Sequence, residues 1–171
     1  MNKEKTNIIL CGFMASGKTS IAKALSKELG YPYIDTDALI IKESKMSIPE
    51  IFDKYGEDYF RDLEYDIAKK TADMKGGVVS TGGGMLTFDR NGEVLQKSGI
   101  IICLVRDFDS IYREIKSDKN RPLAQTKTKD ELREMYESRI LKYQKYADYI
   151  VGNDGSVDDC VKKIMSIIDE S

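Results

Sequence analysis

The sequence predicts an α/β protein in which a mostly parallel sheet lies between two layers of helices. Short apolar runs alternate with helical patterns along the whole chain, an order typical of parallel sheets with helices on both faces. The run at 99–105, GIIICLV, is apolar without interruption, as expected for a strand covered on both sides. At 171 residues the chain has the length of one domain. We therefore expect a three-layer α/β/α sandwich formed by a single domain, 1–171.

The first half of the chain begins with a strand and an amphipathic helix. The strand, 7–11, is an apolar run that ends at a glycine-rich turn. The helix, 18–29, carries apolar residues at every fourth position, and Gly30 provides its stop signal. The next elements are expected in this order: a strand at 31–34, helices at 38–44, 48–55 and 57–73, and a strand at 78–80.

The second half continues the alternation around the apolar strand at 99–105. Helical patterns flank this strand at 88–97 and 109–116. The segment 117–129, SDKNRPLAQTKTK, is polar, contains a proline and lacks periodicity, so we expect an exposed mobile loop there. The last elements are expected to be a helix at 130–146, a strand at 149–151, and a helix at 157–168 that Ser156 caps.

Composition argues against two classes of function, nucleic-acid binding and membrane spanning. The formal net charge of -2 argues against a general nucleic-acid binder, and no apolar run approaches the roughly 20 residues that span a bilayer. The cysteines, Cys11, Cys103 and Cys160, are widely spaced, and we interpret them as reduced core residues of a cytoplasmic protein. Histidine is absent, so catalysis must use carboxylates, cations, backbone dipoles or a hard metal ion.

The segment from Gly12 to Thr19, GFMASGKT, fits the phosphate-loop pattern G-x-x-x-x-G-K-[ST] between a strand and a helix. The glycines let backbone N–H groups surround phosphate oxygens, Lys18 reaches the β and γ phosphates, and the Thr19 hydroxyl is offered to magnesium. The alternative is a chance glycine-rich turn with a solvated lysine. Ala15 stands where many such loops have a third glycine, which is tolerable only if its φ is negative.

Two carboxylates follow the second strand in the sequence YIDTD. If this segment is extended, Asp35 and Asp37 point to opposite sides and serve different ligands. Asp35 would then hold magnesium through water, and Asp37 would accept a proton or hydrogen bond from a substrate hydroxyl. The alternative is that one of the two merely caps the following helix.

The phosphate loop, Asp35 and the triplet 82–84 lie just beyond the ends of predicted strands, so the fold would bring these three motifs to one rim. Three further features each allow two interpretations. Arg61 and Glu64 are three residues apart on one helix, which suits either an exposed ion pair or a guanidinium clamp for a carboxylate ligand. The triplet 82–84, GGG, allows a ligand to approach the backbone closely, or is simply a flexible turn. Arg121, in the polar segment, is either a solvated charge or a residue that neutralises charge on a transferring phosphoryl group.

Taken together, these motifs resemble the shikimate kinase family, small kinases of the nucleoside-monophosphate kinase and P-loop NTPase fold. The similarity covers nearly the whole chain and is carried by ordered segments. These segments are GFMASGKTS, YIDTD, SIPEIFDKYGEDYFRDLE, STGGGM, RPL and RILKYQKYAD. The resemblance implies five parallel strands in the order 2-3-1-4-5, a substrate-binding helical region at about 38–62 and a mobile lid at about 117–129.

The resemblance also implies the reaction and the residues that perform it. The γ-phosphoryl of MgATP would pass to the 3-hydroxyl of shikimate, giving shikimate 3-phosphate and ADP on the route to chorismate, with the enzyme expected as a monomer. Lys18, Asp37 and Arg121 would be catalytic, and Thr19 and Asp35 would hold Mg²⁺. The implied nucleotide-binding residues are Gly12, Ala15, Ser16, Gly17, Lys18, Thr19, Ser20, Arg113, Arg121 and Asn153. The implied substrate-binding residues are Asp37, Arg61, Gly82, Gly83, Gly84 and Arg139.

The residues themselves leave three alternatives to this function. The first is another small-molecule kinase of the same fold, acting on gluconate or a nucleotide. The second is a nucleotide-binding regulator that has lost catalysis, and the third is a nucleic-acid binder, which the charge disfavours.

Overall fold

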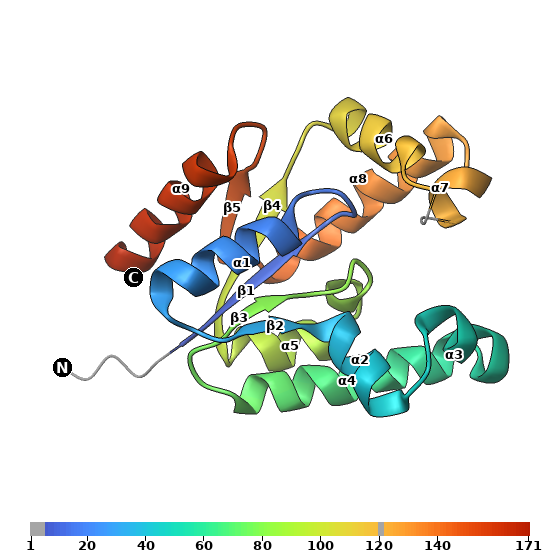
Figure 1. Cartoon of the computed structure of the whole chain (residues 1–171), viewed down its shortest axis with the longest axis horizontal. Helices are drawn as coiled ribbons and strands as arrows, with labels where there is room; N and C mark the ends of the chain where they lie inside the picture. The colour runs from blue at the N-terminus through green and yellow to red at the C-terminus, as the bar shows by residue number, and fades with distance from the viewer. Residues whose placement is uncertain (1–5, 120–121) are drawn as a thin grey trace.

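The computed structural model describes residues 6–119 and 122–171 and shows a five-stranded parallel sheet between helices (Figure 1). The strands are β1 (Asn7–Gly12), β2 (Tyr33–Asp35), β3 (Val78–Ser80), β4 (Gly99–Val105) and β5 (Tyr149–Gly152). Their order in the sheet is β2-β3-β1-β4-β5, and every neighbouring pair is parallel. The predicted α/β/α sandwich and the predicted strand order are confirmed.

Helices cover both faces of the sheet (Figure 1). On one face lie α1 (Lys18–Leu29) and α9 (Val157–Glu170). On the other lie α4 (Glu57–Asp73), α5 (Asp89–Gln96) and α8 (Lys129–Tyr146). The remaining helices lie beyond the carboxyl ends of the strands: α2 (Thr36–Ser44), α3 (Ile48–Tyr55), α6 (Phe108–Ser117) and α7 (Pro122–Thr126).

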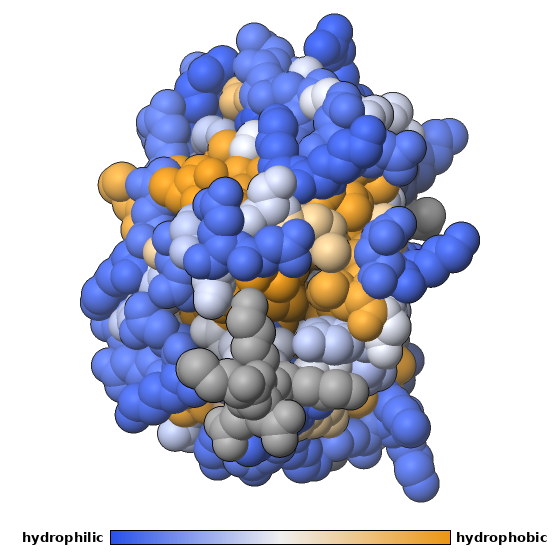
Figure 2. Space-filling view, turned by 90° about the vertical axis from the view of Figure 1, so that its left-hand side faces the viewer, coloured by the Kyte–Doolittle hydropathy of each residue, from blue (hydrophilic) through white to orange (hydrophobic). Residues whose placement is uncertain are grey.

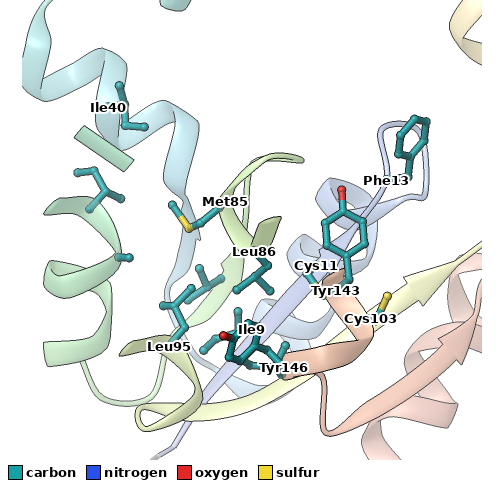
Figure 3. Packing of buried hydrophobic residues seen from close by; sticks show 14 of the residues in the cluster. Ile9, Cys11, Phe13, Ile40, Met85, Leu86, Leu95, Cys103, Tyr143 and Tyr146 are labelled. Carbon is teal, nitrogen blue, oxygen red and sulfur yellow. The ribbon is translucent and has the colours of Figure 1, made fainter. Parts of the chain in front are cut away.

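The core consists of two apolar layers separated by the sheet. Because side chains alternate along a strand, β1 sends Ile8 and Leu10 toward α1 and α9, and Ile9 and Cys11 toward the other face. Figure 3 shows this second layer, in which Tyr143 of α8 lies beside residues of β1 and β4. The layer extends to the phosphate loop and thus ties the loop to the rigid sheet.

Most predicted bounds agree with the structure, and two differences have clear causes. Tyr31 is expected in the second strand, but its N–H donates to the Ser26 carbonyl and its own carbonyl accepts from Ser26 Oγ, so it belongs to the turn that closes the end of α1. The segment 117–129, expected as a loop, contains α7. This helix is too short to give a periodic pattern, and Ala124 anchors it as a fully buried residue.

The described residues include no helix that is long and apolar enough to cross a membrane. Figure 2 views the end of the molecule at which the strands begin. Hydrophilic side chains cover most of this end, and apolar ones show mainly in the recesses between them. The functional motifs lie at the opposite end, where the strands finish.

Candidate active site

A cleft of about 350 Å³ opens at the carboxyl ends of the central strands. Its walls come from the phosphate loop, the start of α2, the turn after β3, and α6. The lining residues are Met14, Ala15, Gly17, Lys18, Thr19, Ser20, Asp35, Asp37, Ser80, Thr81, Gly82, Gly83 and Glu114. The predicted gathering of three separate motifs at one rim is therefore observed.

The phosphate loop leads from β1 into α1. No side chain makes a capping hydrogen bond at the N-terminus of α1. Gly17 has a φ of 97°, and a methyl group on it would lie 2.3 Å from Asn153 Nδ2, so only glycine fits there. Lys18 Nζ donates to the carbonyls of Gly12 at 2.7 Å and Phe13 at 3.0 Å. The loop thus presents a helix N-terminus and a cation to the same cleft, an arrangement that binds phosphate.

Ala15 does not meet the condition under which an alanine is tolerated in this loop. Its φ is 59°, the left-handed conformation that costs a residue other than glycine about 1–2 kcal/mol. Its carbonyl accepts a hydrogen bond from Arg106 Nη1 at 3.0 Å. Sequence reasoning missed Arg106 because a lone arginine after a strand carries no motif.

The two carboxylates of YIDTD line the same cleft. The extended segment that would point them to opposite sides is not present, because Thr36 already begins α2. Asp35 caps this helix, since its Oδ1 accepts from the N–H of Ala38 at 3.1 Å. Its Oδ2 lies 3.4 Å from the Tyr33 hydroxyl. One oxygen of Asp35 therefore has a structural role, as the alternative of a helix cap predicted, and the residue also lines the cleft.

Asp37 lies in the first turn of α2, near enough to Lys18 and Arg61 for both positive charges to act on it. Burial raises its pKa above the ordinary value of 3.8, and the nearby Asp35 carboxylate raises it further. Lys18 and Arg61 act in the opposite direction. A carboxylate that is hard to keep charged and close to a phosphate-binding lysine is suited to accept a proton.

Arg61 projects from α4 and contacts two carboxylates and two aromatic rings. Its Nη1 lies 2.6 Å from Glu64 Oε1, and its Nη2 lies 3.3 Å from Glu57 Oε1. The guanidinium carbon lies 5.3 Å from the ring centre of Phe60 and 5.0 Å from that of Phe88. Because the Glu64 side chain is only 2% exposed, the alternative of a solvated surface pair is wrong.

The turn 82–84 lies close to the side chains of Asp37, Arg61 and Arg139. A methyl group added to Gly82 would lie 2.6 Å from Asp37 Oδ1. One added to Gly83 would lie 3.4 Å from Arg139 Nη1, and one added to Gly84 would lie 2.4 Å from Arg61 Nη1. The Tyr143 hydroxyl donates to the central carbonyl of the turn at 2.5 Å. Glycine is needed at positions 82 and 84 because Asp37 and Arg61 pack closely against the backbone there, while Arg139 makes an ordinary contact at position 83.

We expect Gly82→Ala to lower kcat about tenfold without unfolding the protein. The added methyl would displace the flexible Asp37 carboxylate, and a misplacement of about 1 Å at a reacting group costs up to about 100-fold in rate. Steady-state kinetics with thermal unfolding measure both effects. Gly155→Ala is the matched control, because its methyl would make only an ordinary contact, 3.4 Å from Asp159 Oδ2. Unchanged kcat in Gly82→Ala would contradict the close approach.

The remaining predicted residues have separate positions. Asn153 donates from Nδ2 to the Ser16 carbonyl at 2.8 Å, so it contacts the phosphate loop directly. Arg113 lies exposed on α6 with its Nη2 3.3 Å from Ser110 Oγ. Arg121 lies outside the described residues. Glu114, in the cleft wall, was not predicted, since an acidic residue on a polar helix gives no signal.

Comparison with known proteins decides the family. Residues 14–169 match the family model described as shikimate kinase. The chain belongs to the shikimate kinase family. A shikimate kinase of Thermodesulfovibrio yellowstonii is 38% identical over 93% of this chain and 92% of its own length. One of Macrococcus caseolyticus is 38% identical over 94% of this chain and 95% of its own length.

Solved shikimate kinases share the fold over almost the full chain. The enzyme from Acinetobacter baumannii, in complex with shikimate, superposes with a TM-score of 0.89 at 34% identity, covering 96% of this chain and 93% of its own. The Aquifex aeolicus enzyme gives 0.85 at 33% identity, covering 95% and 96%. These relationships confirm the predicted family and its P-loop fold. They also confirm the prediction that the protein is an ATP-dependent kinase.

Proposed function

We propose that the chain transfers the γ-phosphoryl group of MgATP to the 3-hydroxyl of shikimate, giving shikimate 3-phosphate and ADP on the route to chorismate. The observation that carries this proposal is the turn 82–84, which gathers Asp37, Arg61 and Arg139 beside the phosphate loop. In this proposal Arg61 and Arg139 would bind a carboxylate, Asp37 would accept a proton, and the phosphate loop would hold the nucleotide, in that order from the substrate side. This is the order in which an acidic alcohol and a nucleotide must meet.

Arg61 and Arg139 would bind the substrate carboxylate. Each hydrogen bond to a charged group contributes about 1.5–3 kcal/mol, so the pair favours a hydroxy acid over a neutral polyol. Glu64 keeps the Arg61 fork oriented through its 2.6 Å contact. The backbone of the turn 82–84 would complete the contacts to the ring hydroxyls.

The transfer itself needs one proton acceptor and several positive charges. Asp37 would take the proton of the attacking hydroxyl as its oxygen bonds to the γ-phosphorus and the bond to the β-phosphate oxygen breaks, leaving ADP with the electron pair. Lys18 and the N–H groups of the loop would stabilise the charge on the phosphates. Arg121, from its place in the RPL motif, would add positive charge at the transferred group.

Thr19 and Asp35 would contribute the protein oxygens of a Mg²⁺ site whose other ligands come from the nucleotide phosphates and water. Within residues 6–119 and 122–171 no cluster of three or more acidic, histidine or cysteine side chains could hold a metal ion alone. Magnesium is commonly held by one or two protein oxygens together with phosphates and water. The ion would neutralise charge on the β and γ phosphates when bound.

Arg113 and Asn153 would border the adenine. The helices at 38–62 would form the substrate side of the single domain, and the segment 117–129 would close as a lid over the nucleotide. The described cysteines are free and buried, in keeping with a reducing cytoplasmic location. We propose a monomer, which size-exclusion chromatography with light scattering would test.

A substrate panel tests the proposed function. With MgATP and purified protein, we expect ADP release to require shikimate and not to be supported by gluconate or AMP. Lys18→Ala should abolish release, because it removes the cation of the phosphate loop. Equal turnover of all three acceptors would refute the specificity, and ADP binding without any shikimate-dependent turnover would indicate a regulator instead.

A further inference from the structure

Two side chains from outside the phosphate-loop motif hold the carbonyls of that loop. Arg106, which follows β4, donates from Nη1 to the Ala15 carbonyl at 3.0 Å, and Asn153, which follows β5, donates to the Ser16 carbonyl at 2.8 Å. A phosphate-binding loop must direct its N–H groups at the anion. Its carbonyl groups must therefore point away from the anion and accept hydrogen bonds from other donors. Both donors therefore act on the shape of the loop.

Ala15 is the residue of the loop whose conformation most needs such support. Its φ of 59° lies in the left-handed region, where the Cβ of an L-residue crowds the carbonyl oxygen that follows it. That carbonyl is the one that accepts from Arg106. Because hydrogen bonds from a charged donor are about twice as strong as neutral ones, the guanidinium is suited to offset this crowding.

Arg106 is itself fixed at its guanidinium group and at its backbone. The same Nη1 bonds the Glu114 carboxylate of α6, and the Tyr136 hydroxyl of α8 donates to the Arg106 backbone carbonyl at 3.0 Å. The Arg106 side chain is 29% exposed and that of Glu114 is 54% exposed. The chain from Glu114 through Arg106 to Ala15 thus links α6 to the phosphate loop.

We propose that Arg106, oriented by Glu114, is a positioning residue that keeps Ala15 in its left-handed conformation and so keeps the loop ready for the phosphates of a nucleotide. This inference rests on nucleotide binding by the loop, as in the proposed function. The guanidinium supplies what a glycine would supply through its conformational freedom. The need for Arg106 must then depend on the residue at position 15.

A double-mutant cycle tests this dependence, with affinity for ADP in the presence of Mg²⁺ measured by calorimetry. Arg106→Gln should weaken ADP binding about tenfold, the size of one lost charge-assisted hydrogen bond. In an Ala15→Gly background the same substitution should weaken it less than about twofold, because glycine holds the conformation without help. Shikimate affinity should be the same in all four proteins.

Two further variants keep the test decisive. With alanine at position 15, Glu114→Gln should weaken ADP binding about threefold, and with glycine at that position it should have no effect. This second double-mutant cycle replaces the first one if the Arg106→Gln protein fails to fold. Arg133→Gln is the matched control, since Arg133 is exposed on α8 and pairs with Asp109 at 3.6 Å. It should bind ADP as the wild type does.

The outcomes separate the positioning role from the proposed function. Equal weakening in the alanine and glycine backgrounds would overturn the inference and indicate direct contact between Arg106 and the nucleotide. Unchanged ADP affinity in Arg106→Gln, or a parallel loss of shikimate affinity, would also overturn it. A wild-type protein that bound no ADP would overturn the proposed function as well.

Discussion

Asp37→Asn should lower the turnover of shikimate about 10²–10⁴-fold while making the folded protein more stable. The loss follows because an amide cannot accept the proton of the attacking hydroxyl. The gain follows because burial, with the nearby Asp35 carboxylate, disfavours the charged form of Asp37. The same desolvation that suits Asp37 to act as a base is thus a cost to the fold.

The sign of the pH dependence follows from the raised pKa. The folded state holds the Asp37 proton more tightly than the unfolded chain does, so the destabilisation by its charge is complete above the folded pKa and disappears below the unfolded one. The stability advantage of Asp37→Asn should therefore be present at pH 7 and vanish on acidification. In the wild type, kcat/KM should fall as pH falls through a pKa above 3.8.

Thermal unfolding and pH profiles of both proteins measure these effects. Asp53→Asn, an exposed carboxylate on the neighbouring helix α3, is the control and should change neither turnover nor stability. Near-native kcat in Asp37→Asn would exclude Asp37 as an essential base. Reduced stability at neutral pH would show that its carboxylate instead makes a net favourable contact in the fold.

Much of the fold could be predicted because its signals are local. Both ends of α1 are marked in the sequence, by the phosphate-loop motif before Lys18 and by Gly30 after Leu29. The strand at 99–105 is unambiguous because it is apolar throughout and buried between two layers. Caps, stops and apolar runs act within a few residues and are therefore readable from one chain.

The site was predicted as a set of residues but not as a set of contacts. Burial of Glu64 and the packing of Arg61 against the turn 82–84 depend on where α4 lies relative to β3. The Arg106 contact joins positions 91 residues apart. Such contacts are set by tertiary packing, on which neither spacing nor residue type carries information.

The three glycines of the turn explain how one small segment serves three side chains. A methyl group at position 82 would displace the Asp37 carboxylate and one at position 84 the Arg61 guanidinium, whereas one at position 83 would make only an ordinary contact with Arg139. The turn therefore helps to set the spacing between Asp37 and the two arginines, Arg61 and Arg139. Its support comes from Tyr143, which is buried in the core, so that site geometry depends directly on core packing.

Arg61→Leu should destabilise the protein by about 3–5 kcal/mol and raise the shikimate KM roughly 100-fold. The stability loss arises because Glu64, with a side chain only 2% exposed, would keep a buried charge without its principal partner. Arg61→Lys keeps a cation near Glu64 and should remain close to wild type in stability. Its shikimate KM should still rise about tenfold, because an ammonium cannot make two parallel hydrogen bonds. Arg90→Lys, at an exposed ion pair with Asp62, is the control and should leave both the stability and the shikimate KM unchanged.

The double substitution Arg61→Leu with Glu64→Leu separates stability from binding. Replacing a buried ion pair by apolar residues is often neutral or stabilising, so chemical denaturation should show recovery of most of the lost stability. The shikimate KM should not recover, because no guanidinium remains at that position, and the ATP KM should stay near wild type throughout. A double variant that regained both stability and shikimate affinity would mean that Arg61 supports the fold alone, and the carboxylate would then have to be bound elsewhere.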